Sequence, residues 1–387
     1  MLAVDAIDHV SERENSFDAL KAFLHGSSEK VFGFLTYDLK NQIEQLKSEN
    51  QDHIGFPLLY FFKPRYIIEV RGGKVTFNRN YPEAFDLYER IMAMEPQAAS
   101  HKSQVSIRQM TARTSKEKYL ANVQRIKDQI RAGDFYEMNY CCEYYAEQSQ
   151  IDPVSVFSRL NMSAGAPFSS FVKLHDKYLL CASPERFLRK TGNKIISQPI
   201  KGTIKRGKTQ EENDQLKSQL LHSAKERAEN VMIVDLVRND LAKSAKHGTV
   251  KVDDLFGIYE FPTVNQMIST VSAECRADIH PVDIIRNAFP MGSMTGAPKV
   301  EVMKNIESYE DQKRGLYSGS VGYFTPDGDF DLNVVIRSIF YNASNQYVSI
   351  QVGSAVTYDA DPQSEYDELQ LKARAMLEAL EADKHQS

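Results

Sequence analysis

Hydrophobic and polar positions alternate with two different periods along the chain, and the changes of period mark the predicted elements. Residues 1 to about 95 mix polar helical stretches with aromatic runs typical of strands, such as residues 56–62. A polar segment without a pattern, residues 97–104, then predicts a surface linker. The chain is therefore expected to fall into two unequal parts.

The second part alternates runs of strands with runs of helices. Thr114 and Glu117 form a capping-box pattern, apolar residues follow at helical spacing, and Gly133 can end that helix. The pattern then predicts strands at 168–172, 178–182 and 194–196, a long helix over roughly 209–246, and three strands within 317–356, with a hairpin turn at Asp327-Gly328. A last helix is predicted from near Pro362 to near Leu380. Such runs favour an α+β fold with antiparallel sheets.

Composition narrows the class of protein. The 387 residues are 42% hydrophobic and 26% charged, which is typical of a soluble globular protein. The net charge of −5 disfavours a nucleic-acid partner. We expect no signal peptide and no membrane span, because no long apolar run occurs. The four cysteines contain no CxxC pair, so reduced thiols in a cytoplasmic protein are expected.

Common active-site patterns are missing. The stretch 292–299 resembles a phosphate loop, but Ala297 and Pro298 break the required spacing. No GxGxxG, HExxH or GxSxG occurs, and the nine histidines form no ligand-like pair. Nicotinamide, zinc and serine-hydrolase chemistry are therefore disfavoured.

Several carboxylates stand in unusual surroundings. Glu229 lies in a helical stretch that is apolar almost all round, where a buried carboxylate needs a cation or several donors. Glu365 and Glu368 share one face of the last helix. A single glutamate is more often part of a solvated face or a salt bridge. Three that converge would suit Mg²⁺, although spacing alone does not show convergence.

Lys201 is the second unusual residue, since it follows a strand and precedes Gly202. A lysine is usually exposed, but on a rigid turn beside a pocket a neutral amine can act as a nucleophile. Glu185, which precedes it in the chain, could be the general acid if two strands joined by a turn bring the pair together. Spacing alone gives this pair little support.

A set of sequence blocks in a fixed order resembles the chorismate-utilising enzyme family, which includes the large subunits of anthranilate synthase and aminodeoxychorismate synthase. The blocks are residues 131–136, 183–187, 199–203, 228–241, 289–299, 331–337 and 361–368. Residues 33–39 resemble the family more weakly. The resemblance implies that residues 1–110 are a shortened N-terminal part of the same fold, and that residues 111–387 are the chorismate-binding catalytic region.

The same resemblance implies a fold and a metal site. The fold would be two large antiparallel sheets packed face to face, with helices on the outside. Mg²⁺ would be held by Glu229 and Glu365, with Glu368 bound directly or through water, and would grip the ring carboxylate of chorismate.

The substrate-binding residues are also implied by resemblance. Arg337 and Tyr323 would hold the enolpyruvyl carboxylate, assisted by backbone amides around Gly353. Thr203 would lie at the substrate. Gln266 stands where the family often has histidine, and it can hydrogen-bond a hydroxyl but cannot act as an acid.

Lys201 favours one reaction within the family. The anthranilate enzymes usually carry alanine in this block, whereas enzymes that make 4-amino-4-deoxychorismate for 4-aminobenzoate and folate usually carry lysine. The implied mechanism has Glu185 protonate the departing hydroxyl, Lys201 add to the ring, and ammonia displace the lysine. Relatives that add water use a lysine at the position of Glu137, where the family pattern here usually has glutamine, so water addition is disfavoured.

The resemblance further implies a glutamine amidotransferase partner that supplies ammonia. Two alternatives stay open. One is anthranilate formation, and the other is a catalytically silent chorismate-binding subunit, which the intact Glu185, Lys201, Glu229 and Glu365 disfavour.

Overall fold

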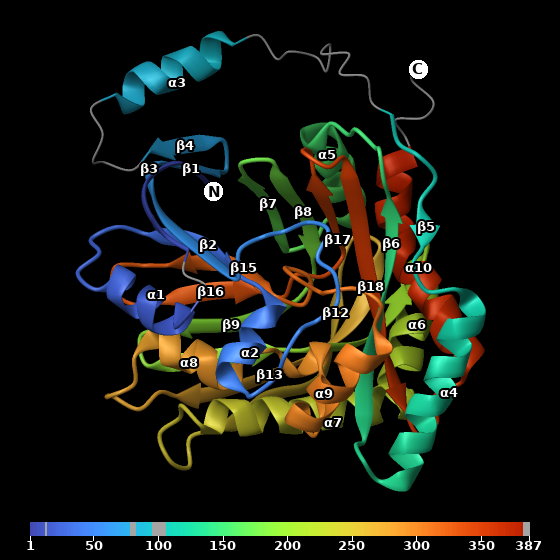
Figure 1. The fold of residues 1–387 in the computed structure, drawn as a ribbon. Coiled ribbons are helices and arrows are strands. Elements are labelled where there is room, and N and C mark those ends of the chain that lie inside the picture. Colours follow the sequence, from blue (N-terminus) through green and yellow to red (C-terminus); the bar gives the residue numbers. More distant parts are fainter. Residues whose placement is uncertain (12–13, 78–82, 95–105, 382–387) are drawn as a thin grey trace.

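The chain forms two antiparallel sheets whose inner faces pack on each other, with helices outside (Figure 1). The computed structural model describes residues 1–11, 14–77, 83–94 and 106–381. The α+β class and the two-sheet architecture predicted from the sequence are confirmed.

The first sheet has eleven strands drawn from both ends of the chain. Its main path runs β1 (Leu2–Val10), β3 (Leu59–Arg71), β2 (Val31–Leu35), β15 (Ser320–Phe324), β16 (Phe330–Asn333), β9 (Arg186–Thr191), β10 (Lys194–Gln198), β13 (Val264–Glu274) and β11 (Ile200–Lys205). β4 (Lys74–Phe77) pairs with β3, and β12 (Lys251–Glu260) pairs with β13. Because β2 pairs with β15, the N-terminal strands extend a sheet that later strands build.

The second sheet has seven strands. Its path runs β14 (Gly296–Ala297), β6 (Glu137–Ala146), β18 (Tyr347–Thr357), β17 (Ser338–Asn342), β8 (Lys177–Ser183) and β7 (Phe168–Leu174), and β5 (Thr111–Ala112) pairs with β6. β6 and β18 are paired over ten residues each, from Val348 opposite Ala146 to Thr357 opposite Glu137. This long ladder fixes the position of Glu137 relative to the rest of the sheet.

Most of the helices cover the outer faces of the sheets. The described helices are α1 (Ser16–Leu24), α2 (Lys40–Ile43), α3 (Ala84–Ala93), α4 (Lys116–Ala132), α5 (Pro153–Ala164), α6 (Gln210–His222), α7 (Ala224–Ala242), α8 (Pro281–Ala288), α9 (Lys299–Tyr309) and α10 (Pro362–Glu381), with short 3₁₀ turns at Tyr37–Leu39 and Gly292–Met294. α4 and α10 lie along the second sheet, while α7 packs below the first (Figure 1).

Two apolar clusters hold these layers together. The first fills the space between the sheets, where Phe61 and Leu188 of the first sheet meet Phe340 and Leu179 of the second. The second lies between the outer face of the second sheet and α4, α5 and α10, and includes Ile126 and Met376. Burial of this kind contributes about 25 cal/mol for each Å² of apolar surface removed from water.

The predicted elements are mostly present, with different boundaries. Ser115, not Thr114, caps α4 by accepting a hydrogen bond from the Lys118 amide, and Gly133 ends the helix at φ 90°. The long helix predicted over 209–246 is two helices, because Ser223 ends α6 and caps α7.

Strands account for the other differences. The region 317–356 holds four strands rather than three, and its turn at Asp327-Gly328 is confirmed by the hairpin of β15 and β16. The last helix is confirmed as α10. The linker predicted at 97–104 lies outside the described residues.

Two smaller expectations can also be compared with the structure. All four cysteines are free, as expected for reduced thiols. In the described part of the chain, no helix combines the length and the apolar character that a membrane crossing requires.

Candidate active site

A cavity of about 430 Å³ opens where the two sheets meet α7 and α10. This volume suits a small-molecule ligand. Nine of the ten site residues predicted from the sequence line it: Glu185, Lys201, Thr203, Glu229, Gln266, Arg337, Gly353, Glu365 and Glu368. The structure therefore brings together side chains that are up to 183 residues apart in sequence, from Glu185 to Glu368.

Lys201 reaches the cavity from a strand, not from the turn that the sequence predicted. It lies in β11, and the next residue, Gly202, has φ +89°. A Cβ atom at Gly202 would lie 2.9 Å from Glu226 Oε2 and 3.0 Å from a Leu220 methyl group. Glycine is thus needed here for both its backbone conformation and its lack of a side chain, which allow α6 and α7 to pack against this strand.

The amine of Lys201 lies between two carboxylates. Its Nζ donates to Glu137 Oε1 at 2.6 Å and lies 3.9 Å from Glu229 Oε2, while the residue is only 9% exposed. Burial by itself lowers the pKa of this amine, but the charges of Glu137 and Glu229 raise it more, so the net shift of the pKa is upward. The predicted neutral nucleophile is therefore a protonated amine in the ligand-free site.

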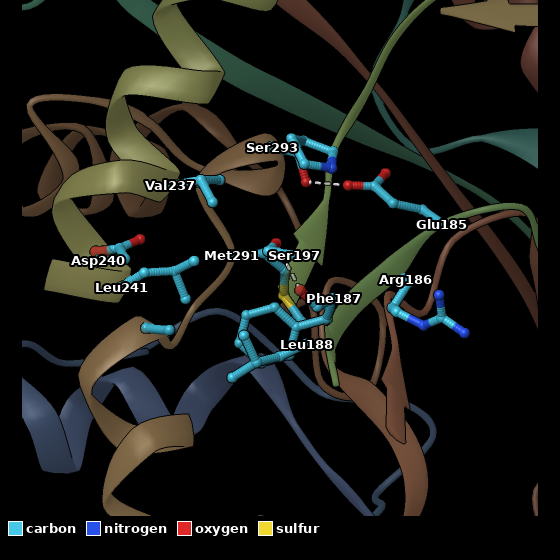
Figure 2. A pocket seen from close by; sticks show the side chains of 13 residues that line it. Glu185, Arg186, Phe187, Leu188, Ser197, Val237, Asp240, Leu241, Met291 and Ser293 are labelled. Atoms are coloured by element: carbon cyan, nitrogen blue, oxygen red, sulfur yellow. Dashed lines mark hydrogen bonds between the residues drawn. The ribbon is translucent and has the colours of Figure 1, made fainter. Parts of the chain in front are cut away.

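Glu185 also lines the cavity and lies between β8 and β9. Its Oε1 accepts a hydrogen bond of 2.7 Å from Ser293 Oγ, and Figure 2 shows these two side chains pointing toward each other. Burial raises the pKa of Glu185 to about 7, against the weaker opposing effects of Ser293 and Lys201. A carboxyl group with such a pKa can donate a proton near neutral pH.

Glu229 and Glu365 share a lysine. Lys225 Nζ lies 2.9 Å from Glu365 Oε1 and 3.9 Å from Glu229 Oε1. Glu229 is buried, and its Oε1 has no hydrogen-bond donor. Burial raises the pKa of Glu229 to about 7, although Lys201 opposes the shift. A buried acceptor left without a donor is costly, so this oxygen is suited to a further cation.

Glu368 completes the acidic side of the cavity. It pairs with Lys372 at 2.6 Å, and although burial raises its pKa, Lys372 lowers the pKa more, so the net shift is downward. Within the described residues, no three acidic, histidine or cysteine side chains lie close enough together to hold a metal ion. Glu229, Glu365 and Glu368 have the oxygen donors that magnesium prefers and line one cavity, but they do not converge here, because Lys225 and Lys372 hold them in an ion-pair network.

Arg337 provides a half-buried positive charge that faces the cavity. It has φ 53°, an uncommon backbone conformation for this residue type. Its Nη1 donates to the Lys372 carbonyl at 3.4 Å, and burial lowers its pKa. A fork of donors facing a cavity is suited to a carboxylate.

The prediction for Tyr323 is corrected by the structure. Tyr323 lies in β15 with its ring 5.8 Å from that of Phe32 and near Lys30, and it does not line the cavity. Tyr317 lines the cavity together with Arg337. Tyr317 precedes β15 and adopts the turn that leads into it, a position that strand periodicity did not single out.

The remaining predicted residues lie on strands that end at the cavity. Thr203 of β11 is opposite Gln266 of β13, and Gln266 Oε1 has no hydrogen-bond donor. Gly353 lies in β18, where a Cβ atom would come within 2.6 Å of Asn139 Oδ1 and Cys141 Sγ. Gly353 therefore lets β6 side chains approach the strand that borders the site.

Besides Tyr317, two residues that hold the predicted catalytic side chains were not assigned from the sequence. Glu137 holds Lys201, and Ser293 holds Glu185. The signal for Glu137 was present, because a carboxylate begins a strand made mostly of aromatic and sulfur-containing residues. Ser293 gave no signal, since a serine in a glycine-rich stretch has many ordinary roles.

Comparisons with known proteins agree with this geometry. Residues 4–378 match the family described as chorismate binding enzyme. The aminodeoxychorismate synthase component 1 of Bacillus subtilis is 32% identical over 371 residues, which is 92% of this chain and 78% of that protein. The crystal structure of anthranilate synthase component I from Streptococcus pneumoniae has a TM-score of 0.85 at 25% identity, covering 97% of this chain and 91% of that one.

A plant relative is more similar over a shorter stretch. The probable chloroplastic aminodeoxychorismate synthase of rice is 41% identical over 282 residues, or 72% of this chain. The match covers 31% of the rice protein, so the chain spans about a third of that relative's length.

Proposed function

The chain belongs to the chorismate binding enzyme family, and on that premise we propose that it converts chorismate and ammonia to 4-amino-4-deoxychorismate, a precursor of 4-aminobenzoate and folate. The relatives named above carry either this activity or the anthranilate activity in their names. The choice between the two reactions therefore depends on the residues of the site.

The position of Lys201 is the observation that carries the proposal. A lysine amine is buried in the cavity, held by Glu137 at 2.6 Å, and faces the same space as Glu185. A purely structural lysine would place its amine at the surface or pair it outside a ligand cavity. An amine in this place supports a covalent route, which splits one difficult substitution into two easier ones.

In the first half of the proposed reaction, Lys201 gives one proton to solvent, and the lone pair of the neutral amine forms a bond to a ring carbon. The π electrons of the conjugated ring shift toward the carbon that bears the hydroxyl, and the electrons of the C–O bond leave with the oxygen, which departs as water after taking a proton from Glu185. The raised pKa of Glu185, about 7, keeps this proton available near neutral pH. Ser293 keeps the carboxyl group turned toward the cavity.

In the second half, the lone pair of ammonia forms the new C–N bond where the hydroxyl was. The bond to Lys201 breaks, and its electrons return to the lysine nitrogen. The new ammonium group gives up one proton, which restores Glu185 to its acid form. The sum of the two halves is chorismate plus ammonia giving aminodeoxychorismate plus water.

Arg337 is placed to bind a carboxylate of the substrate. It is half-buried, and the described residues offer it no carboxylate within ion-pair distance. We propose that it takes the enolpyruvyl carboxylate, with Tyr317 beside it in place of Tyr323 and with the backbone around Gly353. Thr203 and Gln266, whose Oε1 is without a donor, would contact the ring hydroxyl.

Magnesium is part of the proposal. Glu229 and Glu365 would hold it, with Glu368 directly or through water, once Lys225 has moved away from the first two. When bound, the ion would neutralise the ring carboxylate of chorismate and orient the substrate. The unpartnered Oε1 of Glu229 supports a cation at this place.

A separate glutamine amidotransferase subunit is proposed as the source of ammonia. The support is the name component 1 in the Bacillus subtilis relative. A cytoplasmic location is proposed as well, and the four free cysteines are consistent with a reducing compartment.

The direct test is to give the purified protein chorismate, Mg²⁺ and ammonium. If the proposal is right, 4-aminobenzoate forms only after an aminodeoxychorismate lyase is added. Fluorescent anthranilate formed without the lyase would establish the alternative reaction. Binding of chorismate without any turnover would identify a silent subunit.

A further inference from the structure

Glu137 is a buried carboxylate to which the proposed reaction assigns no role. It is the first residue of β6 and is 1% exposed. Its Oε1 accepts from Lys201, while its Oε2 has no hydrogen-bond donor. The pair joins the two sheets, because Lys201 comes from β11 of the first sheet and Glu137 from β6 of the second.

The backbone of Glu137 is held from both sides. Glu137 is paired with Ala297 of β14 on one side and with Thr357 of β18 on the other. Gly296 approaches so closely that a Cβ atom there would lie 2.0 Å from the Glu137 carbonyl oxygen. A carboxylate with a backbone fixed in this way is a rigid point of attachment.

Lys201 needs such a point of attachment. A lysine side chain has four rotatable bonds, and its rotamer freedom amounts to about 2 kcal/mol. Glu229 lies 3.9 Å from the amine, which is too long for a hydrogen bond. Among the described side chains, only Glu137 accepts a hydrogen bond from this amine.

We propose that Glu137 is the positioning residue of the nucleophile, and that it holds one N–H of Lys201 so that the lone pair of the amine is directed into the cavity. The proposal rests on the proposed function, because it assumes that this amine attacks the substrate. Glu137 acts through Lys201 and does not itself contact the substrate. Placement matters because a shift of about 1 Å in a reacting group can lower a rate by about 10²-fold.

Three substitutions separate positioning from a general effect on folding. Glu137→Leu removes the acceptor, Glu137→Asp withdraws it by one methylene, and Glu137→Gln keeps an acceptor oxygen at the same reach. Glu143→Leu is the matched control, because Glu143 is also buried in β6 and also pairs with a cation, Arg113 at 2.5 Å, but this partner does not line the cavity as Lys201 does.

The rate of lysine-adduct formation is measured by rapid quench and mass spectrometry, with chorismate and Mg²⁺ present and ammonium absent. Glu137→Leu is expected to slow adduct formation by about 10²-fold, and Glu137→Asp by about tenfold or more. Glu137→Gln is expected to stay within about tenfold of the natural chain. Because the substrate sites are untouched, the KM for chorismate is expected to change by less than about twofold in all three.

Crystal structures of the ligand-free variants give a readout that does not depend on the reaction. Lys201 Nζ is expected to leave its place in Glu137→Leu and to keep it in Glu137→Gln. An unmoved amine in Glu137→Leu, or an adduct formed at the natural rate, overturns the positioning role. If the natural chain forms no adduct but the amine still moves in Glu137→Leu, the covalent function fails while Glu137 remains the residue that places the amine.

Discussion

Two buried clusters of charged side chains contact β6 at positions two residues apart, Glu137 and Asn139. They differ in how completely their carboxylates are hydrogen-bonded. At Asn139, the backbone carbonyl accepts from Arg314, which also forms a two-pronged pair with Glu310 at 2.6 and 2.9 Å. Glu310 in turn accepts from the Cys141 amide. The guanidinium of Arg314 is thus surrounded by fixed acceptors.

The cluster at Glu137 is incomplete by comparison. Oxygen atoms of Glu137, Glu229 and Gln266 lack donors, although all three residues are buried. Uncharged groups near Arg314, such as Gln312 and Gln351, also leave an oxygen unpaired, so the difference between the clusters lies in the carboxylates. Both oxygens of Glu310 accept hydrogen bonds, whereas Glu137 and Glu229 each leave one oxygen without a donor, which is costly unless a ligand completes the site. The comparison indicates that the Arg314 cluster stabilises the sheets, whereas the Lys201 cluster is left open to a ligand.

The largest effect on activity is expected from a substitution in the Lys201 cluster. Lys201→Ala is expected to lower aminodeoxychorismate formation by roughly 10⁴- to 10⁶-fold, the range found when members of a catalytic unit are removed. The melting temperature is expected to stay within a few degrees of that of the natural chain. Product is measured with ammonium and added lyase. Full activity in this variant would leave the amine without a catalytic role.

Glu185→Gln is expected to have the next largest effect, because an amide cannot supply a proton. The loss is expected to be about 10²- to 10⁴-fold. In the natural chain, the pKa of Glu185 is raised to about 7, while the pKa of Lys201 is raised above its ordinary value. Above pH 7 the loss of protonated Glu185 is offset by the gain of neutral Lys201, so kcat/KM for adduct formation should rise up to about pH 7 and then level off. In Glu185→Gln the levelling at pH 7 should be absent. The profile is recorded without ammonium, whose own deprotonation would otherwise add a further rise.

A substitution in the Arg314 cluster should lower the free energy of unfolding and leave the rate of adduct formation nearly unchanged. Arg314→Met leaves Glu310 buried without its partner, and loss of one member of a buried pair costs about 3–5 kcal/mol. Urea unfolding measures this loss. The adduct rate per folded molecule is expected to change little, and a large fall in that rate with unchanged stability would contradict the division between the two clusters.

The smallest expected effect concerns Lys225, the cation shared by Glu229 and Glu365. Lys225→Met removes a competitor for these carboxylates, so Mg²⁺ should bind roughly two- to fivefold more tightly, as expected for a partly exposed ion pair. Isothermal titration of the protein with Mg²⁺ measures the change without any turnover. Arg238→Met, which removes an exposed helix cation outside the cavity, is the control.

Most of the site could be predicted because its residues lie in contiguous sequence blocks. Lys201, Glu185 and Glu229 each have recognisable neighbours, and the structure places all three at one cavity. Tyr317 was missed, because its ring reaches the cavity from a turn, while Tyr323 looked equally plausible on a strand. The ion pair of Glu137 and Lys201 joins strands of different sheets, and such a pair leaves no pattern in the sequence of either strand.

The fold was predictable at the level of class and less so at the level of elements. β9, β12 and the helix break at Ser223 were not predicted, because short strands and a capping serine resemble their polar surroundings. The order of strands in the sheets could not be predicted from hydrophobic periodicity, because periodicity is a local pattern. β2, for example, pairs with β15, which follows it by about 285 residues.

The position of α10 has a consequence for how the protein is made on the ribosome. Glu365, Glu368 and Lys372 enter the cavity from this helix, while Glu137 and Lys201 are synthesised far earlier. A nascent chain without α10 therefore lacks one wall of its cavity and also the helix that covers the second apolar cluster. Products of early translation termination should be unable to react and should expose the apolar residues that α10 covers, until a separately supplied C-terminal helix docks in trans.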